Sequence, residues 1–293
     1  MLGEVLTAIV TPFNADGSVS LDKFRELAVF LIEHGSDGIV VSGTTGESPT
    51  LSDEEKLDLF AAAVDAVGDR ATVVAGTGTY DTAHSAKLTA EAHGLGVDAF
   101  LVVTPYYNKP PQRAIVRHFQ SIAASTDKPI VVYNIPSRVI VNIEPETIAE
   151  LGKIENVHAV KQANDDLDQA RRIVELGLDL YAGDDNLIFP FLELGGIGGI
   201  SVHAHVWGPQ TRAMVRLFKE GDRDGARRLN EEMAPAYDLL KIQTNPIPIK
   251  AALNLLGHEV GPYRLPMVEP TEAELDQIRL CLERAGILAA AKA

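Results

Sequence analysis

The sequence predicts an α/β fold in which eight parallel strands, each followed by a helix, close into a barrel. Eight short runs rich in Val and Ile recur about 20 to 35 residues apart, and amphipathic segments of helical length separate them. The runs are apolar throughout instead of alternating, as in strands that are buried on both faces. Eight such units in about 220 residues match the count of a (β/α)8 TIM barrel.

The expected strands follow one another at regular intervals. They are VLTAIV (5–10), GIVVSG (38–43), TVVAGT (72–77), AFLVVT (99–104), IVVYNI (130–135), VHAVK (157–161), DLYAG (179–183) and GISVHA (199–204). The first helical segment places Phe24, Leu27 and Leu31 on one face, and Ser52 with Glu55 has the spacing of a capping box at the next. A doubly wound open sheet is the competing fold, but it usually has fewer strands and a glycine fingerprint that the first turn, TPFNADGS, lacks.

The strand signal stops after about residue 222. The segments DGARRLNEEMAPAYDLLKI, PIKAALNLLG and EAELDQIRLCLERAGIL have helical patterns, and TNPIPI and GPYRLPMVEP interrupt them. We therefore expect a catalytic barrel over residues 1–221 and a C-terminal helical domain over residues 222–293.

Composition excludes several classes of function. The 293 residues carry 26 basic and 41 acidic side chains, a formal charge of −15, which argues against binding to the phosphate backbone of a nucleic acid. The single cysteine, Cys281, excludes an intramolecular disulfide framework and suits a reducing compartment. The N-terminus has no basic region typical of a signal peptide, and no apolar run approaches the roughly 18 residues that span a membrane. We expect a soluble, cytoplasmic protein.

Lys161 ends the sixth expected strand. Of eleven lysines it alone lies at the carboxyl end of a strand, where the chemistry of such barrels gathers. One interpretation is that the strand has reached solvent and the lysine is structural. The other is that the amine lies in a pocket, where loss of solvation lowers its pKa from about 10.4 and leaves it neutral enough to attack a carbonyl and form an imine.

The other strand ends deliver hydroxyls, phenols and one arginine. SGTTGES follows the second strand, and its glycines allow close approach of a ligand, although a tight turn explains them equally well. Tyr133 can be an ordinary half-buried aromatic. Arg138 can be a surface charge, but an arginine in the loop after a strand suits a carboxylate that accepts two hydrogen bonds.

Two further motifs are better explained by structure than by ligand binding. GGIGG (195–199) precedes the eighth strand, so it suits a helix end and a tight approach to the strand better than a phosphate site. His203 and His205 lie on the same face of the expected eighth strand and could ligate a metal, but the other strand ends offer only GDD as further ligands. We expect no metal.

Taken together, GTTGES (43–48), TPYYNKP (104–110), YNIPSR (133–138), the lysine of the sixth strand, GDD (183–185) and NPIPIK (245–250) closely resemble the dihydrodipicolinate synthase family of pyruvate-dependent aldolases. The resemblance covers nearly the whole chain, including the helical tail. It implies an enzyme that condenses pyruvate with L-aspartate 4-semialdehyde in the diaminopimelate route to lysine. It also implies a homotetramer built as a dimer of dimers.

The resemblance also implies roles for the catalytic residues. Lys161 would form a Schiff base with pyruvate, and Tyr133 would donate and accept protons there. Thr44 and Tyr107 would complete a proton relay with Tyr133, with Tyr107 reaching in from a neighbouring subunit. The enzyme amine serves as the electron sink, so no metal or organic cofactor is expected.

Four residues would hold the substrates. Thr45 would bind the pyruvate carboxylate, the backbone at Ile200 would line the same pocket, and Gly183 would leave room beside the imine. Arg138 would hold the carboxylate of aspartate semialdehyde. This arginine and the two threonines of GTTGE favour the synthase over its sister enzymes, the N-acetylneuraminate lyases and sugar-acid aldolases. A catalytically silent sensor on the same barrel would have Lys161 or Tyr133 replaced, and neither is replaced here.

The sequence departs from its relatives at two places. SVHAH stands where many of them have SVTAN, and we interpret its histidines as supporting or rim residues. In lysine-inhibited relatives the inhibitor lies near positions equivalent to Ser48, Tyr80, His84 and Tyr106. Here Lys56 and His84 replace a histidine and a carboxylate, so a cationic inhibitor loses its acidic partner. We expect weak or absent inhibition by lysine, with an inhibition constant no lower than about 1 mM.

Overall fold

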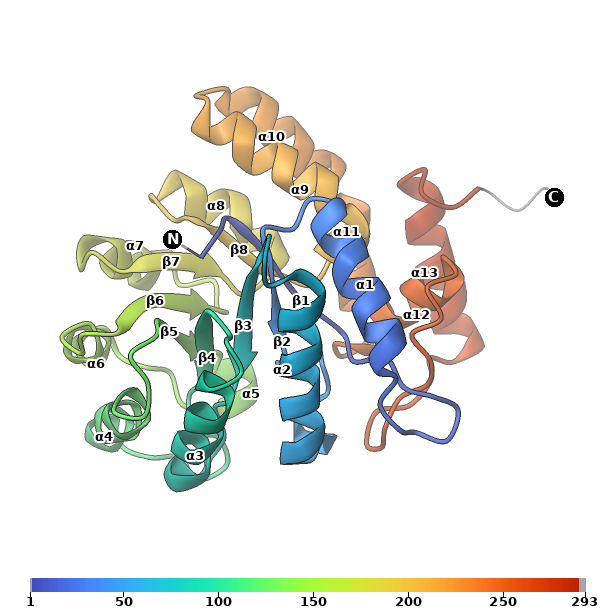
Figure 1. Ribbon diagram of the computed structural model, residues 1–293. Coiled ribbons are helices and arrows are strands. Elements are labelled where there is room, and N and C mark those ends of the chain that lie inside the picture. Colours follow the sequence, from blue (N-terminus) through green and yellow to red (C-terminus); the bar gives the residue numbers. More distant parts are fainter. Residues whose placement is uncertain (1, 290–293) are drawn as a thin grey trace.

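The computed structural model describes residues 2–289 and forms a closed barrel of eight parallel strands in the order β1 to β8 (Figure 1). The strands are β1 (Val5–Ala8), β2 (Gly38–Val41), β3 (Thr72–Gly76), β4 (Ala99–Val103), β5 (Ile130–Asn134), β6 (Val157–Gln162), β7 (Asp179–Ala182) and β8 (Gly198–Ser201). Each pairs with the next, and β1 pairs with β8. The predicted (β/α)8 fold is confirmed.

Helices connect the strands and continue beyond the last of them. Around the barrel lie α1 (Leu21–Glu33), α2 (Asp53–Val67), α3 (Thr82–His93), α4 (Gln112–Ala123), α5 (Pro136–Val139), α6 (Pro145–Leu151), α7 (Leu167–Glu175) and α8 (Ile188–Glu193), with short 3-10 turns at Ser48–Thr50 and Asp185–Leu187. After β8 come α9 (Ala204–Lys219), α10 (Arg223–Glu232), α11 (Ala234–Lys241), α12 (Ile247–Leu255) and α13 (Glu272–Arg284). No helix within residues 2–289 is long and apolar enough to cross a bilayer.

Local sequence signals explain where several helices begin. The Ser52 hydroxyl accepts a hydrogen bond from the Glu55 backbone N–H, and the Glu55 carboxylate accepts one from the Ser52 backbone N–H, which confirms the predicted capping box. The same pattern of Thr271 and Glu274 begins α13. Helix α1 buries Phe24, as predicted from its periodicity.

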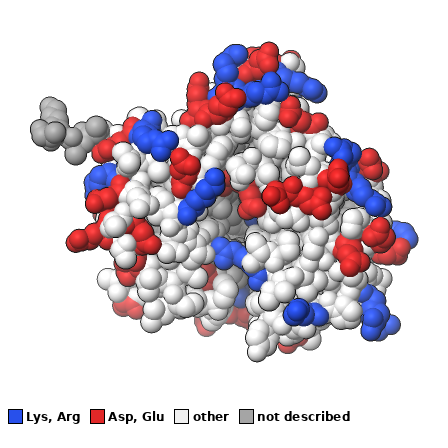
Figure 2. Space-filling model, turned by 180° about the vertical axis from the view of Figure 1, so that it is seen from behind, with Lys and Arg blue, Asp and Glu red and all other residues white. Residues whose placement is uncertain are grey.

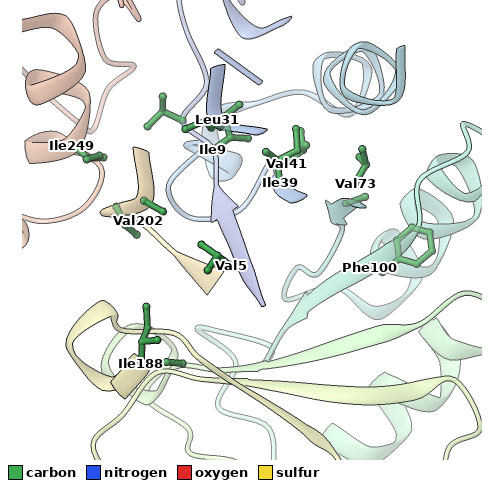
Figure 3. Packing of buried hydrophobic residues seen from close by; sticks show 14 of the residues in the cluster. Val5, Ile9, Leu31, Ile39, Val41, Val73, Phe100, Ile188, Val202 and Ile249 are labelled. Atoms are coloured by element: carbon green, nitrogen blue, oxygen red, sulfur yellow. The ribbon is translucent and has the colours of Figure 1, made fainter. Parts of the chain in front are cut away.

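The strands are apolar on both faces because each face packs against a different layer. Alternate residues such as Leu6, Val40 and Val131 fill the barrel interior, whereas Val5 and Ile39 pack outward against the helices. Figure 3 shows the outer layer, in which side chains from β1, β2 and β3 meet side chains from the helices, with Leu31, Ile188 and Ile249 among those labelled. This division explains why the sequence shows continuous rather than alternating apolar runs.

The eighth strand is shorter than predicted. It ends at Ser201, and the chain then turns into α9, so His203 and His205 do not belong to a strand. The prediction that they share one face of a strand is therefore wrong. The glycines at the start of β8 and just before it have the predicted packing role: a Cβ on Gly198 would lie 1.9 Å from the Glu4 carbonyl oxygen, and one on Gly196 would lie 2.8 Å from that of Phe191.

The last three helices pack on one another and lie together on one side of the barrel, coloured orange to red in Figure 1. The division of the chain at residue 222 stays a prediction, and residues 1 and 290–293 of the predicted domains lie outside the described residues. A buried ion pair joins this helical part to the barrel: Lys250 Nζ in α12 lies 2.8 Å from Glu47 Oε1, in the loop after β2.

Candidate active site

Two adjoining cavities of about 300 and 210 Å³ open at the carboxyl ends of the strands. Thr44, Tyr133, Ile135 and Arg138 line both of them. Lys161 lines the larger one, which is also bounded by the C-terminal part of α11 and the loop after it. The molecular face seen in Figure 2 is hollowed near its centre, and basic side chains lie at the edge of the hollow.

Lys161 lies inside the barrel and not at its surface. It is the fifth residue of β6, its side chain points to the same side as Ala159 in the barrel interior, and the residue is 4% exposed. Burial lowers the pKa of the amine to about 8, although Asp184 and Asp185 oppose the shift. The amine is therefore largely neutral above that pH, as the imine interpretation requires.

Tyr133 is the neighbour of Lys161 on the adjacent strand. The two residues are paired in the parallel ladder of β5 and β6, and Lys161 Nζ lies 4.3 Å from the centre of the Tyr133 ring. Burial, with a further contribution from Asp184, raises the pKa of the phenol, while Arg138 and a hydrogen bond with Thr44 oppose the shift. The phenol thus holds its proton firmly beside the amine, and Thr44 lies within hydrogen-bonding distance to exchange it.

Thr45 lies deeper in the same loop and is tied to the helical part of the chain. Thr45 is 2% exposed, and its hydroxyl oxygen accepts a hydrogen bond of 2.9 Å from Asn245 Nδ2. Because the oxygen accepts this bond, the Thr45 hydroxyl hydrogen stays available for a ligand in the cavity. The buried Asn245 Oδ1 has no partner within residues 2–289.

Arg138 lies on the short helix α5, directly after β5, and its side chain lines both cavities. Its guanidinium makes two long contacts of 3.4 Å, to the Thr244 hydroxyl and the Asn245 carbonyl oxygen. It has no carboxylate partner within residues 2–289, so its fork of donors is available to an anion.

Three further predicted site residues have different surroundings. Gly183 lines the larger cavity, but a Cβ there would lie 2.6 Å from Ala163 Cβ, so close packing of the chain after β6 requires this glycine. Ile200 is fully buried in the barrel interior and is not among the residues that line the cavities. Tyr107 is 88% exposed with a φ of 67°, in the loop after β4. It lines neither cavity, whereas its neighbour Tyr106 lines the smaller one.

The two aspartates after β7 were not predicted as site residues. The Asp185 carboxylate is buried and accepts hydrogen bonds from the Ser201 hydroxyl and from the backbone N–H groups of Val202 and His203. It thereby fixes the turn between β8 and α9. Asp184 faces the larger cavity, and the surrounding walls raise the pKa of its carboxyl through loss of solvation, against the effect of Lys161. The GDD motif was the signal that could have identified them.

His203 and His205 are fully buried supports of that turn and not rim residues. His205 Nε2 accepts from the Val10 backbone N–H at 3.1 Å, so its Nδ1 carries the hydrogen and donates to the Val202 carbonyl oxygen at 2.8 Å. Burial lowers the pKa of His205 to about 4. His203 bonds to the Thr211 hydroxyl at 2.7 Å. Within residues 2–289, no three His, Cys, Asp or Glu side chains gather in a way that could hold a metal ion.

A family model described as the dihydrodipicolinate synthetase family matches residues 1–285. The chain belongs to this family. It is 50% identical to a relative from Moorella thermoacetica over 98% of this chain and 99% of the relative, and 48% identical to one from Desulforudis audaxviator over 98% of both. Both relatives are named 4-hydroxy-tetrahydrodipicolinate synthase.

Solved structures of the dihydrodipicolinate synthase family have the same fold. The enzyme from Cyanidioschyzon merolae, solved with lysine bound, superposes with a TM-score of 0.96 at 41% identity, over 98% of this chain and 99% of that one. A structure described as the first monomeric dihydrodipicolinate synthase variant superposes with a TM-score of 0.95 at 37% identity, over 98% of both chains.

In this member of the family, an amide pair lies one residue beyond Tyr133 and Lys161. Asn134 and Gln162 form the next rung of the β5–β6 ladder, and their side chains point outward from the barrel. Asn134 Nδ2 donates to Gln162 Oε1 at 3.0 Å, and both residues are fully buried. The rung holds the strand ends that present the phenol and the amine.

The amide pair extends into a buried network. Gln162 Nε2 donates to Gln169 Oε1 at 2.6 Å, and Gln169 Nε2 donates to the Ile143 carbonyl oxygen at 2.6 Å. Asn134 also accepts from the Ile143 backbone N–H at 3.1 Å and donates to Asn142 Oδ1 at 2.7 Å. The network closes the base of the loop that carries Arg138, so one set of amides fixes both strand ends and this loop.

Proposed function

We propose that the chain is a 4-hydroxy-tetrahydrodipicolinate synthase, which condenses pyruvate with L-aspartate 4-semialdehyde. The observation that carries the proposal is the buried Lys161 amine, with its lowered pKa, beside Tyr133 in a cavity that also contains the unpaired Arg138. A neutral amine, a proton donor and an anion site are the three groups that this condensation needs.

The reaction begins on the keto acid. The lone pair of Lys161 Nζ attacks the pyruvate carbonyl carbon, and loss of one water gives an imine. Loss of a proton from the methyl group gives an enamine, whose carbon attacks the aldehyde carbon and forms the new carbon–carbon bond. The amino group of the acceptor then attacks the imine carbon and displaces Lys161, which closes the ring and frees the enzyme.

The hydroxyl groups move the protons. Tyr133 is the group nearest the amine that can give a proton to the departing oxygen and take one back, and the raised pKa of its phenol makes it dependent on a relay. Thr44 supplies the first step of that relay. Tyr107 of a neighbouring subunit supplies the second, since the residue is almost fully exposed on its own chain.

The remaining predicted residues hold the substrates. The Thr45 hydroxyl and the backbone near Ile200 hold the pyruvate carboxylate, Gly183 borders the imine, and Arg138 holds the carboxylate of the acceptor. Every covalent step uses the Lys161 amine, so the proposal includes no metal and no organic cofactor.

Assembly and regulation complete the proposal. We infer a homotetramer of two tight dimers that works in the cytoplasm and is inhibited weakly or not at all by lysine. Burial lowers the pKa of Lys56, which lies in the region where lysine binds in inhibited relatives. In the same region the His84 ring bonds to the Asp53 carboxylate at 2.8 Å, so this carboxylate is already engaged by a side chain of the same chain. Sedimentation measures the subunit number, and an inhibition constant for lysine below about 1 mM would contradict the inference on regulation.

The choice of acceptor tests the proposed function. The purified protein is incubated with pyruvate and, separately, with aspartate semialdehyde, N-acetylmannosamine or glyceraldehyde, and consumption of pyruvate is followed. We expect turnover with aspartate semialdehyde alone. Turnover with a sugar acceptor and none with aspartate semialdehyde would identify a sister aldolase instead.

A further inference from the structure

Asp184 and Asp185 are adjacent in the chain but have different surroundings. Both oxygens of the Asp185 carboxylate accept hydrogen bonds from the turn after β8, where the donors are the Ser201 hydroxyl and the backbone N–H groups of Val202 and His203. The Asp184 side chain makes no hydrogen bond and no ion pair with any residue in the range 2–289, and it is exposed to the cavity that Lys161 lines. A carboxylate left unpaired in a cavity is available to a cationic ligand.

The cavity therefore holds unpaired charges of both signs. Arg138 has no carboxylate partner within the described residues, and neither has Lys241, which contributes a second exposed cation from the end of α11. Asp184 lines the same cavity as Lys161, Tyr133 and Arg138, and its charge raises the pKa of the Lys161 amine and of the Tyr133 phenol, so it lies near the reacting end of the cavity. A ligand with one anionic and one cationic group would match this arrangement.

We propose that Asp184 binds the ammonium group of the acceptor aldehyde and makes the site selective for an α-amino aldehyde acid. The inference rests on the proposed function, and it assigns to Asp184 the substrate group that Arg138 cannot hold. In aspartate semialdehyde one carbon carries both the carboxylate and the ammonium. Arg138 and Asp184 together match these two charges, and the aldehyde carbon remains free to face the enamine on Lys161.

The assignment explains how the site distinguishes two similar acceptors. Succinic semialdehyde has the same carboxylate and aldehyde but no amino group, so Arg138 alone holds both acceptors equally well. With Asp184 present, only the amino acceptor pairs both charges of the cavity. A site that is built to bond a polar group of its ligand discriminates strongly against an analogue that lacks the group.

The test compares the two acceptors on Asp184→Asn, which removes the charge and keeps the shape. The Michaelis constant is measured for aspartate semialdehyde, and succinic semialdehyde is measured as an inhibitor that competes with it. Pyruvate trapping by borohydride, at a pH of about 9 where Lys161 is mostly neutral, reports whether the donor half of the site is intact. The matched control is Asp165→Asn, because Asp165 is an exposed carboxylate whose charge acts on Asp184 but which does not line the cavity.

We expect Asp184→Asn to raise the Michaelis constant for aspartate semialdehyde about tenfold or more, the effect of losing a hydrogen bond between charged groups. The inhibition constant of succinic semialdehyde should stay within about twofold, pyruvate trapping should be unchanged, and Asp165→Asn should resemble the unsubstituted protein.

Equal weakening of both acceptors, unchanged binding of aspartate semialdehyde, or loss of pyruvate trapping would each overturn the assignment to Asp184. The proposed function fails separately: it fails if the unsubstituted protein neither traps pyruvate nor consumes aspartate semialdehyde.

Discussion

Lys161 and Tyr133 face each other across one rung of the β5–β6 ladder, with the Lys161 amine 4.3 Å from the centre of the Tyr133 ring. Parallel pairing makes this juxtaposition a property of the backbone, because two adjacent strands present their inward residues at the same height. The amine thus lies in an apolar barrel interior next to a buried phenol, the group that we propose exchanges protons with it. The effect of this arrangement on the stability of the fold, on the rate of turnover and on the reactivity of the amine can each be measured.

The buried amine should make the fold less stable at neutral pH. In the unfolded chain Lys161 binds a proton below a pH of about 10.5, whereas in the folded protein it does so only below a pH of about 8. This difference in pKa corresponds to about 3 kcal/mol of folding free energy. The penalty is complete below the folded pKa and disappears as the pH rises through the unfolded pKa. We predict that Lys161→Met is more stable than the original protein at pH 7 and that the advantage shrinks towards pH 10.5. Unfolding curves at both pH values measure it, and a less stable variant at pH 7 would contradict the account.

The buried ion pair of Lys250 and Glu47 should be essential for the fold. Lys250 Nζ also donates to the carbonyl oxygens of Thr11 and Pro262, and both charged side chains are at most 1% exposed. Lys250→Met leaves the Glu47 carboxylate buried without its cation, which we expect to cost about 3–5 kcal/mol. Denaturant titration measures the loss, and Lys153→Met, which breaks an exposed pair with Glu150, is the control with little expected effect. Similar curves for the two variants would argue against the assigned role.

The amide rung of Asn134 and Gln162 should affect turnover as well as stability. Gln162→Leu removes the link to Asn134 and lets the end of β6 shift, so we predict a fall in kcat of about tenfold or more with little change in KM for pyruvate. Gln169→Leu is the matched control, because it breaks the same network from α7 and not from the strand that carries Lys161. Equal losses of kcat in two variants of equal thermal stability would show that the Asn134–Gln162 rung has no positioning role of its own.

Tyr107 should act in a site of another subunit. We predict that inactive Tyr107→Phe and inactive Lys161→Ala chains regain activity when they are mixed under conditions of subunit exchange, because a mixed pair contains one site with an intact Lys161 and a Tyr107 from the other chain. Activity of the mixture is the measurement. Failure to recover, with exchange verified by mass, would remove Tyr107 from the relay.

The barrel could be predicted from the sequence because each strand is apolar on both faces and is followed by a helical period. The ends of the strands were less accurate, because apolar residues continue past the last ladder bond. Ile9 and Val10 stay buried after β1 ends at Ala8, and Val202 stays buried after β8 ends at Ser201. Buried loops at a barrel mouth have the same composition as the strands, so hydrophobicity does not mark the boundary.

The candidate site could be predicted in part. Lys161 was identified because one lysine among eleven ends a strand, which is a local signal. The separate environments of Asp184 and Asp185 depend on the turn after β8, and the partners of Asn134 and Gln162 come from α7 and the segment before α6. Such contacts join residues 7 to 16 positions apart across different elements, and periodicity does not reveal them. The polar residues directly after Tyr133 and Lys161 were one trace of the network in the sequence.

The central claim is that the nitrogen of Lys161 captures the keto acid covalently. Borohydride reduction in the presence of pyruvate, followed by peptide mass mapping over a range of pH, tests it most directly. We predict a mass gain on the peptide containing Lys161 alone, with a rate that rises with pH around a midpoint of about 8 and levels off above it. Modification at another lysine, or a midpoint near that of a free surface amine, would contradict it.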